Sequence, residues 1–249
     1  MKLVKLFFSL STLIILGSCG SQTTQVDESD RESDVIYDTV MVETAILTQE
    51  EQQAMTPEDV MELFRKGNER FTNNDLTARD HSAQVRKSVG GQYPKAIVLS
   101  CVDSRVPVED VFDRGIGDIF VARVAGNFVN EDILGSMEYA CKVAGSKLIL
   151  VMGHEHCGAV KAAVDDVKMG NITPMLEKIK PAVDDVVYEG DRTSKNPEFV
   201  HKVCESNVEH TIANIREQSP ILKELEANGD IKIVGATYDM DTGEVHFME

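Results

Sequence analysis

Two short stretches of the sequence place cysteine and histidine where they could bind a metal ion. The first carries Cys101, and the second carries His154 and Cys157. Two thiolates and one imidazole are ligands that suit Zn²⁺, and three protein ligands leave a fourth coordination position free. A free position distinguishes a catalytic zinc site from a structural one, because water or substrate can occupy it. The residue types therefore predict a catalytic zinc site.

Two other uses of these residues stay open. A fourth ligand from Asp103 or His156 would make the zinc structural, although structural sites mostly take ligands in tight pairs, and only His154 and Cys157 form one here. A redox role for Cys101 and Cys157 is the weaker alternative, because the chain has no C-x-x-C motif. Metal ligation would protect both thiolates from oxidation.

Asp103 and Arg105 follow Cys101 closely enough to act on the same site. A carboxylate two residues from a ligand can accept a hydrogen bond from the group in the fourth position, and a nearby arginine can hold that carboxylate ionised through a bidentate pair. The alternative is an ion pair at the surface with no part in catalysis. Their place beside a metal loop favours the catalytic interpretation.

Short, continuously apolar, β-branched runs predict the strands that position these loops. The runs cover residues 96–99, 119–124, 148–152 and 231–236, and a final edge strand is expected at 245–248. Helical patterns lie between them, at 133–144 and 197–218, after a first helix at 57–71 that Thr56 caps. This alternation predicts a single α/β domain with a mainly parallel four-stranded sheet, an added edge strand and helices on both faces. Ligands gather at the carboxyl ends of such strands, where both cysteine loops fall.

The first residues have the pattern of an export signal. Lys2 and Lys5 precede an apolar run at 6–16, and a small pair leads to Cys19, which resembles the lipobox of bacterial lipoproteins. The resemblance implies a signal peptide at 1–18, a lipidated Cys19, and a protein that is exported and anchored to a bacterial membrane, facing the periplasm. The alternative is an ordinary signal peptide cleaved near Ser18.

Residues 19–53 are rich in polar and acidic side chains, so after Cys19 we predict a flexible tether leading to a folded domain at 54–249. The alternative is that 40–47 adds a strand or an arm to a neighbouring subunit. The formal net charge of −17 excludes nucleic acid as a partner and also disfavours anionic lipid headgroups. Membrane attachment would therefore depend on acyl chains at Cys19.

The two metal loops together resemble the paired signature of β-class carbonic anhydrases. The matching motifs are Cys101-x-Asp103-Ser104-Arg105 and Gly153-His154-x-x-Cys157-Gly158, and the similarity runs from about residue 57 to 240, including Val106-Pro107, Phe120-Val121-x-Arg123 and Glu138-Tyr139-Ala140. The resemblance implies strand order 2-1-3-4 and a homodimer or tetramer. It also implies reversible hydration of CO₂ to bicarbonate by attack of zinc-bound hydroxide.

Carried over to this sequence, the family pattern assigns one Zn²⁺ per subunit to Cys101, His154 and Cys157. It makes Asp103 the acceptor of a hydrogen bond from the hydroxide and Arg105 the partner that holds Asp103. Some members of the class resemble a closed form, in which the equivalent of Asp103 leaves the arginine and takes the fourth zinc position. The resemblance leaves open which form this chain adopts.

Four further residues match substrate-binding positions of the family. Gln92 resembles a glutamine that plant-like members extend across a dimer interface toward a substrate oxygen, and the backbone N–H of Gly158 is the second donor. Phe120 and Tyr139 match aromatic residues that line an apolar pocket. The alternatives are a plain loop residue for Gln92 and ordinary core packing for the two aromatic residues.

Two other functions fit the same residues. Relatives of this scaffold hydrolyse CS₂ or COS, and a zinc- and bicarbonate-binding module without turnover is a third possibility. The intact set of Asp103, Arg105 and Gln92 argues against a module without turnover. Cys141 and Cys204 fall on apolar helix faces and are expected to be buried packing residues.

Overall fold

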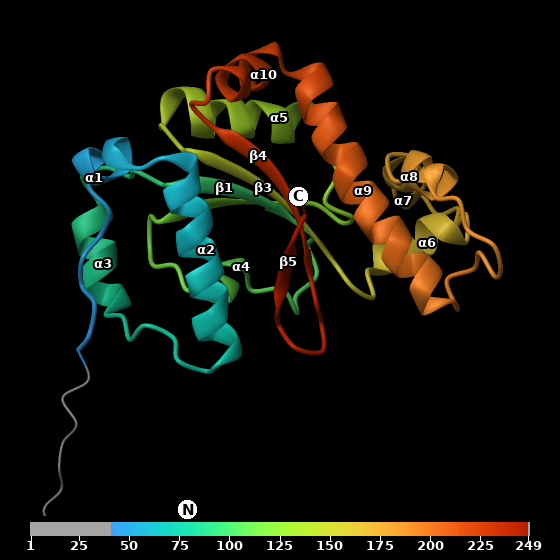
Figure 1. The fold of residues 1–249 in the computed structure, drawn as a ribbon, viewed down its shortest axis with the longest axis horizontal. Helices are drawn as coiled ribbons and strands as arrows, with labels where there is room; N and C mark the ends of the chain where they lie inside the picture. The colour runs from blue at the N-terminus through green and yellow to red at the C-terminus, as the bar shows by residue number, and fades with distance from the viewer. Residues whose placement is uncertain (1–40, 249) are drawn as a thin grey trace, which may run out of the picture. The chain divides into compact units, whose positions relative to one another are not determined.

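Five short runs rich in β-branched residues form one sheet in the computed structural model, which describes residues 41–248 (Figure 1). They are β1 (Ala96–Ser100), β2 (Ile119–Arg123), β3 (Leu148–His154), β4 (Lys232–Tyr238) and β5 (Val245–Phe247). The spatial order is β2-β1-β3-β4-β5, with parallel pairing from β2 through β4 and antiparallel pairing between β4 and β5. The predicted sheet, its strand order and its edge strand are confirmed.

Ten α-helices lie within residues 41–248, three of which match the predicted helices at 57–71, 133–144 and 197–218. They are α1 (Gln49–Ala54), α2 (Pro57–Thr72), α3 (His81–Ser88), α4 (Val108–Val111), α5 (Glu131–Glu138), α6 (Gly158–Val164), α7 (Ile172–Leu176), α8 (Lys180–Asp185), α9 (Pro197–Gln218) and α10 (Pro220–Ala227). Thr56 caps α2 as predicted, because its side chain accepts a hydrogen bond from the backbone amide of Asp59. The predicted helix at 133–144 corresponds to α5 together with the π-helical turn that directly continues it, η1 (Tyr139–Val143).

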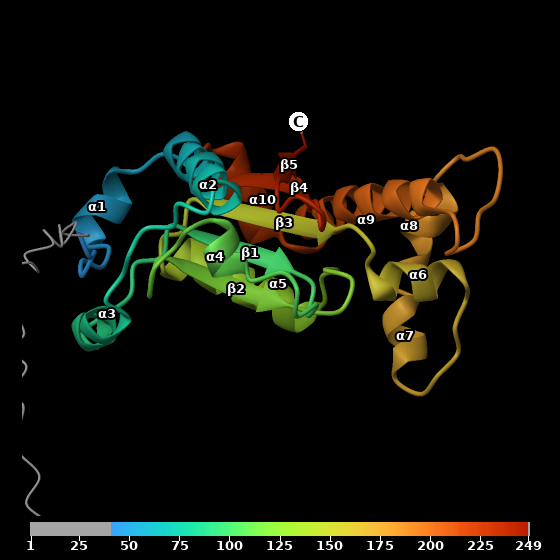
Figure 2. The same ribbon diagram turned by 90° about the horizontal axis from the view of Figure 1, so that it is seen from below.

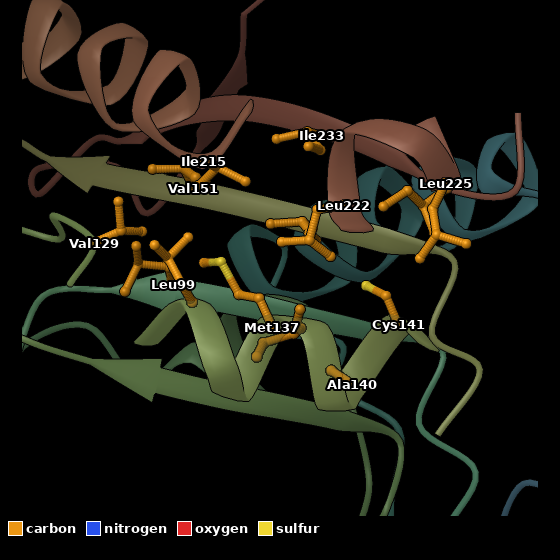
Figure 3. Close-up of a cluster of buried hydrophobic side chains, with 14 of the residues drawn as sticks. Leu99, Val129, Met137, Ala140, Cys141, Val151, Ile215, Leu222, Leu225 and Ile233 are labelled. Atoms are coloured by element: carbon orange, nitrogen blue, oxygen red, sulfur yellow. The ribbon is translucent and has the colours of Figure 1, made fainter. Parts of the chain in front are cut away.

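Both faces of the sheet are covered along its central strands, which explains why β1 and β3 are buried at every position and almost entirely apolar. On one face, α5, η1, α9 and α10 cover side chains such as Leu99, Val151 and Ile233 (Figure 3). On the other face, α2 and α4 cover Val98 and Leu150. A third cluster joins α6, α7 and α8 to the first half of α9, and Figure 2 shows these helices gathered beyond the carboxyl ends of the strands. The metal loops therefore emerge into a region closed by helices.

The predicted tether is wrong for its described part, residues 41–53. Thr48 forms a capping box with Glu51 at the start of α1, and the buried side-chain amide of Gln52 donates to the carbonyls of Pro94 and Ala144 at 2.8 Å each. Glutamine is typical of tethers, but here its amide satisfies two backbone acceptors of the domain. The predicted signal peptide and Cys19 lie outside the described residues.

No helix within residues 41–248 has both the length and the apolar character that a membrane span requires.

A buried carboxylate just after α4 binds both α2 and the segment that follows α2. Asp113 is 1% exposed and accepts hydrogen bonds from Arg70, Arg79 and Thr77. Burial by itself would raise the pKa of Asp113, but these three partners outweigh burial and lower it to about 2. The folded state therefore stabilises the ionised form of Asp113 more than the unfolded chain does.

We predict that Asp113→Asn lowers the free energy of unfolding by about 3 kcal/mol at neutral pH, since it leaves buried arginine nitrogens without their charge partner. The folded pKa lies below the unfolded value, so this stabilisation is present above about pH 4 and is lost as the pH falls toward 2. Urea unfolding of both proteins at several pH values measures the difference. Glu62→Gln is the control, because its pair with Lys66 is exposed and should contribute less than about 0.5 kcal/mol. A constant difference between pH 7 and pH 2 would contradict the assignment.

Candidate metal centre

The sheet register brings the two cysteine loops together. β1 and β3 are parallel neighbours, and Leu99 pairs with Val151. Cys101 follows the end of β1, whereas His154 is the last residue of β3. Cys157 then immediately precedes α6. Two loops separated by more than 50 residues in the sequence therefore open at one edge of the sheet, as the strand pattern predicted.

The three predicted metal ligands meet at this edge. One ligand atom each from Cys101, His154 and Cys157 lie within 4.8 Å of one another. All three residues are buried, with exposed fractions of 4%, 1% and 1%. Sulfur and nitrogen atoms at these separations can share one tetrahedral ion, and three ligands leave its fourth position open.

The hydrogen bonding of His154 determines which of its ring nitrogens faces this cluster. Nδ1 lies 2.8 Å from the backbone carbonyl of Glu155, so Nδ1 carries the proton and donates. Nε2 is then left with a lone pair, and this buried atom has no hydrogen-bond partner within residues 41–248. A metal-binding histidine usually donates its other ring nitrogen to a carbonyl or carboxylate in this way. The donor set and the orphaned nitrogen thus fit zinc.

The side chains of Cys101 and Cys157 interact and shift each other's pKa in opposite directions. The interaction with Cys157 lowers the pKa of Cys101, whereas the interaction with Cys101 together with burial raises the pKa of Cys157. The backbone N–H of Gly126 also donates to Cys101 Sγ, at 3.4 Å. Cys101 is therefore ready to bind as a thiolate, and metal binding would displace the remaining proton from Cys157.

Asp103 and Arg105 form the predicted bidentate pair. Arg105 Nε and Nη2 donate to the two carboxylate oxygens at 2.9 and 2.8 Å, and the Arg105 amide adds a third bond at 3.0 Å. These bonds hold the pKa of Asp103 well below its usual range. Asp103 Oδ2 lies 3.9 Å from His154 Nε2, so the ionised carboxylate stands next to the ligand set while it stays paired with Arg105.

Arg123 is a residue of the site to which the sequence interpretation assigned no role. From the end of β2, its guanidinium donates to the carbonyls of Cys101, Asp103 and Val106, at 2.8, 2.7 and 2.9 Å. One side chain thus holds the backbone of the loop that carries both a metal ligand and the carboxylate. The signal available in the sequence was a charged residue among the apolar residues of a predicted strand.

The predicted substrate-binding residues do not all reach the metal ligands within one chain. Gly158 directly follows Cys157 as the first residue of α6. The first N–H groups of a helix have no carbonyl partner within that helix, so the Gly158 amide is available to a ligand. Phe120 and Tyr139 pack edge to face at 6.1 Å and line a cavity of about 660 Å³ that includes none of the three metal ligands. Gln92 is exposed before β1, at the opposite end of that strand from Cys101.

Cys141 and Cys204 have the buried surroundings that were predicted, and His156 lies outside the ligand cluster. Cys141 and Cys204 are free and buried, and burial raises the pKa of each thiol to about 12. His156 is exposed in the loop between the two ligands, with a positive φ of 55°. None of these three residues belongs to the cluster of ligand atoms around Cys101.

Comparison with known proteins agrees with this geometry. A carbonic anhydrase 2 of Mycobacterium tuberculosis is 35% identical over 193 residues, which cover 75% of this chain and 90% of that protein. The solved structure of a Coccomyxa β-carbonic anhydrase in complex with acetazolamide has a TM-score of 0.60 at 28% identity, covering 76% of this chain and 84% of that one. A tetrameric β-carbonic anhydrase of Sordaria macrospora has a TM-score of 0.58 at 26% identity, covering 66% and 85%.

The family model described as carbonic anhydrase matches residues 96–245, which include the four parallel strands of the sheet and all three predicted metal ligands. Its match spans more than half of the chain, and the solved relatives share the fold and belong to the β class. The chain belongs to the carbonic anhydrase family, in its β class.

Proposed function

We propose that the chain catalyses the reversible hydration of CO₂ to bicarbonate at the centre formed by Cys101, His154 and Cys157. The observation that carries the proposal is the placement of a paired, ionised Asp103 beside a Cys₂His ligand set with one open position. Zinc bound by these ligands supplies Lewis acidity, which lowers the pKa of water from about 15.7 towards 7.

The protein's own groups then orient the reacting water. Asp103 is ionised and therefore acts only as an acceptor, so it can take a hydrogen bond from the water and direct a lone pair toward CO₂. Arg105 keeps the carboxylate in place through two side-chain bonds, and Arg123 holds the loop backbone. The proton released in each turnover passes to buffer in a separate step.

Gln92 is proposed to act from a second subunit, because within its own chain it lies at the far end of β1 from the ligands. Phe120 and Tyr139 line a cavity that opens at the surface, and Tyr139 is 50% exposed, so a neighbouring chain could complete a CO₂ pocket there. The tetrameric relative supports a homo-oligomer. Sedimentation velocity should find a dimer or tetramer, and a purely monomeric active enzyme would contradict the shared pocket.

The rival substrates COS and CS₂ require the same ligand set. One preparation, with its zinc content measured, should be assayed by stopped flow with CO₂ across a range of pH and then with COS and CS₂. We expect rapid CO₂ hydration that rises with zinc content and much slower turnover of the sulfur substrates. Faster turnover of CS₂ or COS would favour the hydrolase alternative, and zinc binding without turnover would favour a binding module.

Anchoring through a lipidated Cys19 is also proposed, on the sequence pattern alone. It would place the enzyme on a bacterial membrane, facing the periplasm. Incorporation of labelled palmitate into the expressed full chain, and its loss in Cys19→Ser, tests the anchor. An unlabelled, fully soluble wild-type protein in a bacterial host that lipidates a known lipoprotein would refute it.

A further inference from the structure

A tight turn after β2 delivers the amide that contacts the metal ligand Cys101. The turn is closed by a hydrogen bond from the Asn127 amide to the Val124 carbonyl, at 3.0 Å. Gly126 occupies its third position with a φ of 83°, which a type II turn requires there. A Cβ atom on Gly126 would also lie 2.3 Å from Cδ1 of Ile179. The direction of the Gly126 amide is therefore set by a turn that only glycine fits.

Two polar side chains of α9 hold this turn from the side. Asn207 Nδ2 donates to the Gly126 carbonyl at 2.8 Å, and Thr211 Oγ1, one helical turn later, donates to the Asn127 carbonyl at 3.3 Å. Both residues are 1% exposed. Within the described residues, each side chain thus donates to a carbonyl of the same short turn, directly beside the metal centre.

An amide at position 207 is costly to bury. The same face of α9 carries Cys204, Val208 and Ile215, all of which pack into apolar clusters. The Asn207 oxygen Oδ1 has no hydrogen-bond partner within residues 41–248, so the side chain contributes there as a donor alone. A leucine of similar volume would pack without that penalty. The donation to Gly126 is thus the contact that distinguishes asparagine from an apolar residue here.

The Gly126 amide can tune the metal through Cys101. An N–H group that donates to a thiolate stabilises the negative charge on sulfur and so reduces the electron density that the sulfur gives to a bound ion. Two thiolates already offset the charge of Zn²⁺, so a weaker donation from one of them keeps the ion a stronger Lewis acid. The orientation of this one peptide therefore bears on the central property of the site.

We propose that Asn207 is a positioning residue for the metal centre: it holds the 124–127 turn so that the Gly126 amide points at Cys101 Sγ. The inference rests on the proposed zinc site and adds a residue of α9, 81 positions away from Gly126 in the sequence, to the groups that control it. Asn207 acts through the turn and touches neither the metal nor the substrate.

The test compares Asn207→Leu with Thr211→Val, a matched control that removes the other buried hydrogen bond from α9 to the same turn. Zinc affinity is measured by competition with a chromogenic chelator, and the energy of the near-ultraviolet thiolate-to-metal band is measured in the Co²⁺-substituted full chain. Asn207→Leu should bind zinc about tenfold more weakly, at the low end of what outer-sphere changes cost. Its charge-transfer band should move to lower energy, because the thiolate loses a hydrogen bond. Thr211→Val should change both values much less, because its longer bond of 3.3 Å goes to Asn127 and leaves the bond to Gly126 in place.

Equal changes in the two variants would reduce Asn207 to a structural residue and overturn the proposal, as would an unchanged band in Asn207→Leu. If Asn207→Leu does not fold, Asn207→Ala removes the same donor without added bulk and carries the same expectation. Failure of the metal site itself is a separate outcome, because the wild-type chain would then show no stoichiometric zinc and no thiolate-to-cobalt band.

Discussion

Replacing His154 with alanine will give a folded protein that no longer retains zinc and no longer hydrates CO₂. The change removes the one nitrogen ligand, whose free Nε2 is buried in the cluster with Cys101 and Cys157. Changes in groups that only support a ligand cost about 10–100-fold in metal affinity, so loss of a ligand should cost more than about 100-fold. Zinc per chain after dialysis, with stopped-flow CO₂ hydration on the same sample, measures both effects. Cys101→Ala should give the same result.

The matched control is His156→Asn, two residues further along the same loop. His156 is exposed and has a φ of 55°, a conformation that asparagine adopts readily. This variant should keep one zinc per chain and full activity, while circular dichroism confirms the fold of both proteins. A His154→Ala protein that kept one zinc per chain through dialysis would show that the ring nitrogen is not a ligand.

The sheet could be predicted from the sequence because its strands are buried on both faces. β1 and β3 are buried at every position, so they appear in the sequence as continuous apolar runs rather than as alternating patterns. Once those runs are placed in a parallel sheet, Cys101 and His154 must open at the same edge. The ligand set therefore followed from strand order together with residue type.

The contacts that complete the site could not be predicted in this way. Arg123 and Asn207 act on backbone carbonyls, and a carbonyl has the same chemistry in every residue, so no spacing in the sequence identifies the partner. Gln52 shows the same limit, because its amide orders a segment whose polar composition is typical of a tether. Where a polar side chain binds backbone brought from far along the chain, only the folded structure reveals its role.

Asp103→Ala will retain its zinc and lose most of its turnover. The three ligands are unchanged, so about one zinc per chain should survive dialysis. The lost carboxylate is the acceptor that stands 3.9 Å from His154 Nε2, and its removal leaves the reacting water without a fixed orientation. We expect kcat to fall by about 100-fold, as is usual when an outer-sphere partner is removed. Asp110→Asn, an exposed carboxylate in the first turn of α4, is the control and should leave kcat unchanged.

The role of Arg105 can be tested together with that of Asp103. Arg105 places both of its bidentate bonds on Asp103, so it is expected to act only through that carboxylate. Arg105→Ala should therefore lower kcat by itself, because Asp103 is released from its position, but should add nothing once Asp103 is alanine. In a double-mutant cycle the two effects would not add, which is the result expected of residues that work as one unit. Additive losses would mean that Arg105 contacts the substrate directly, and undiminished CO₂ hydration in Asp103→Ala would remove the carboxylate from the mechanism.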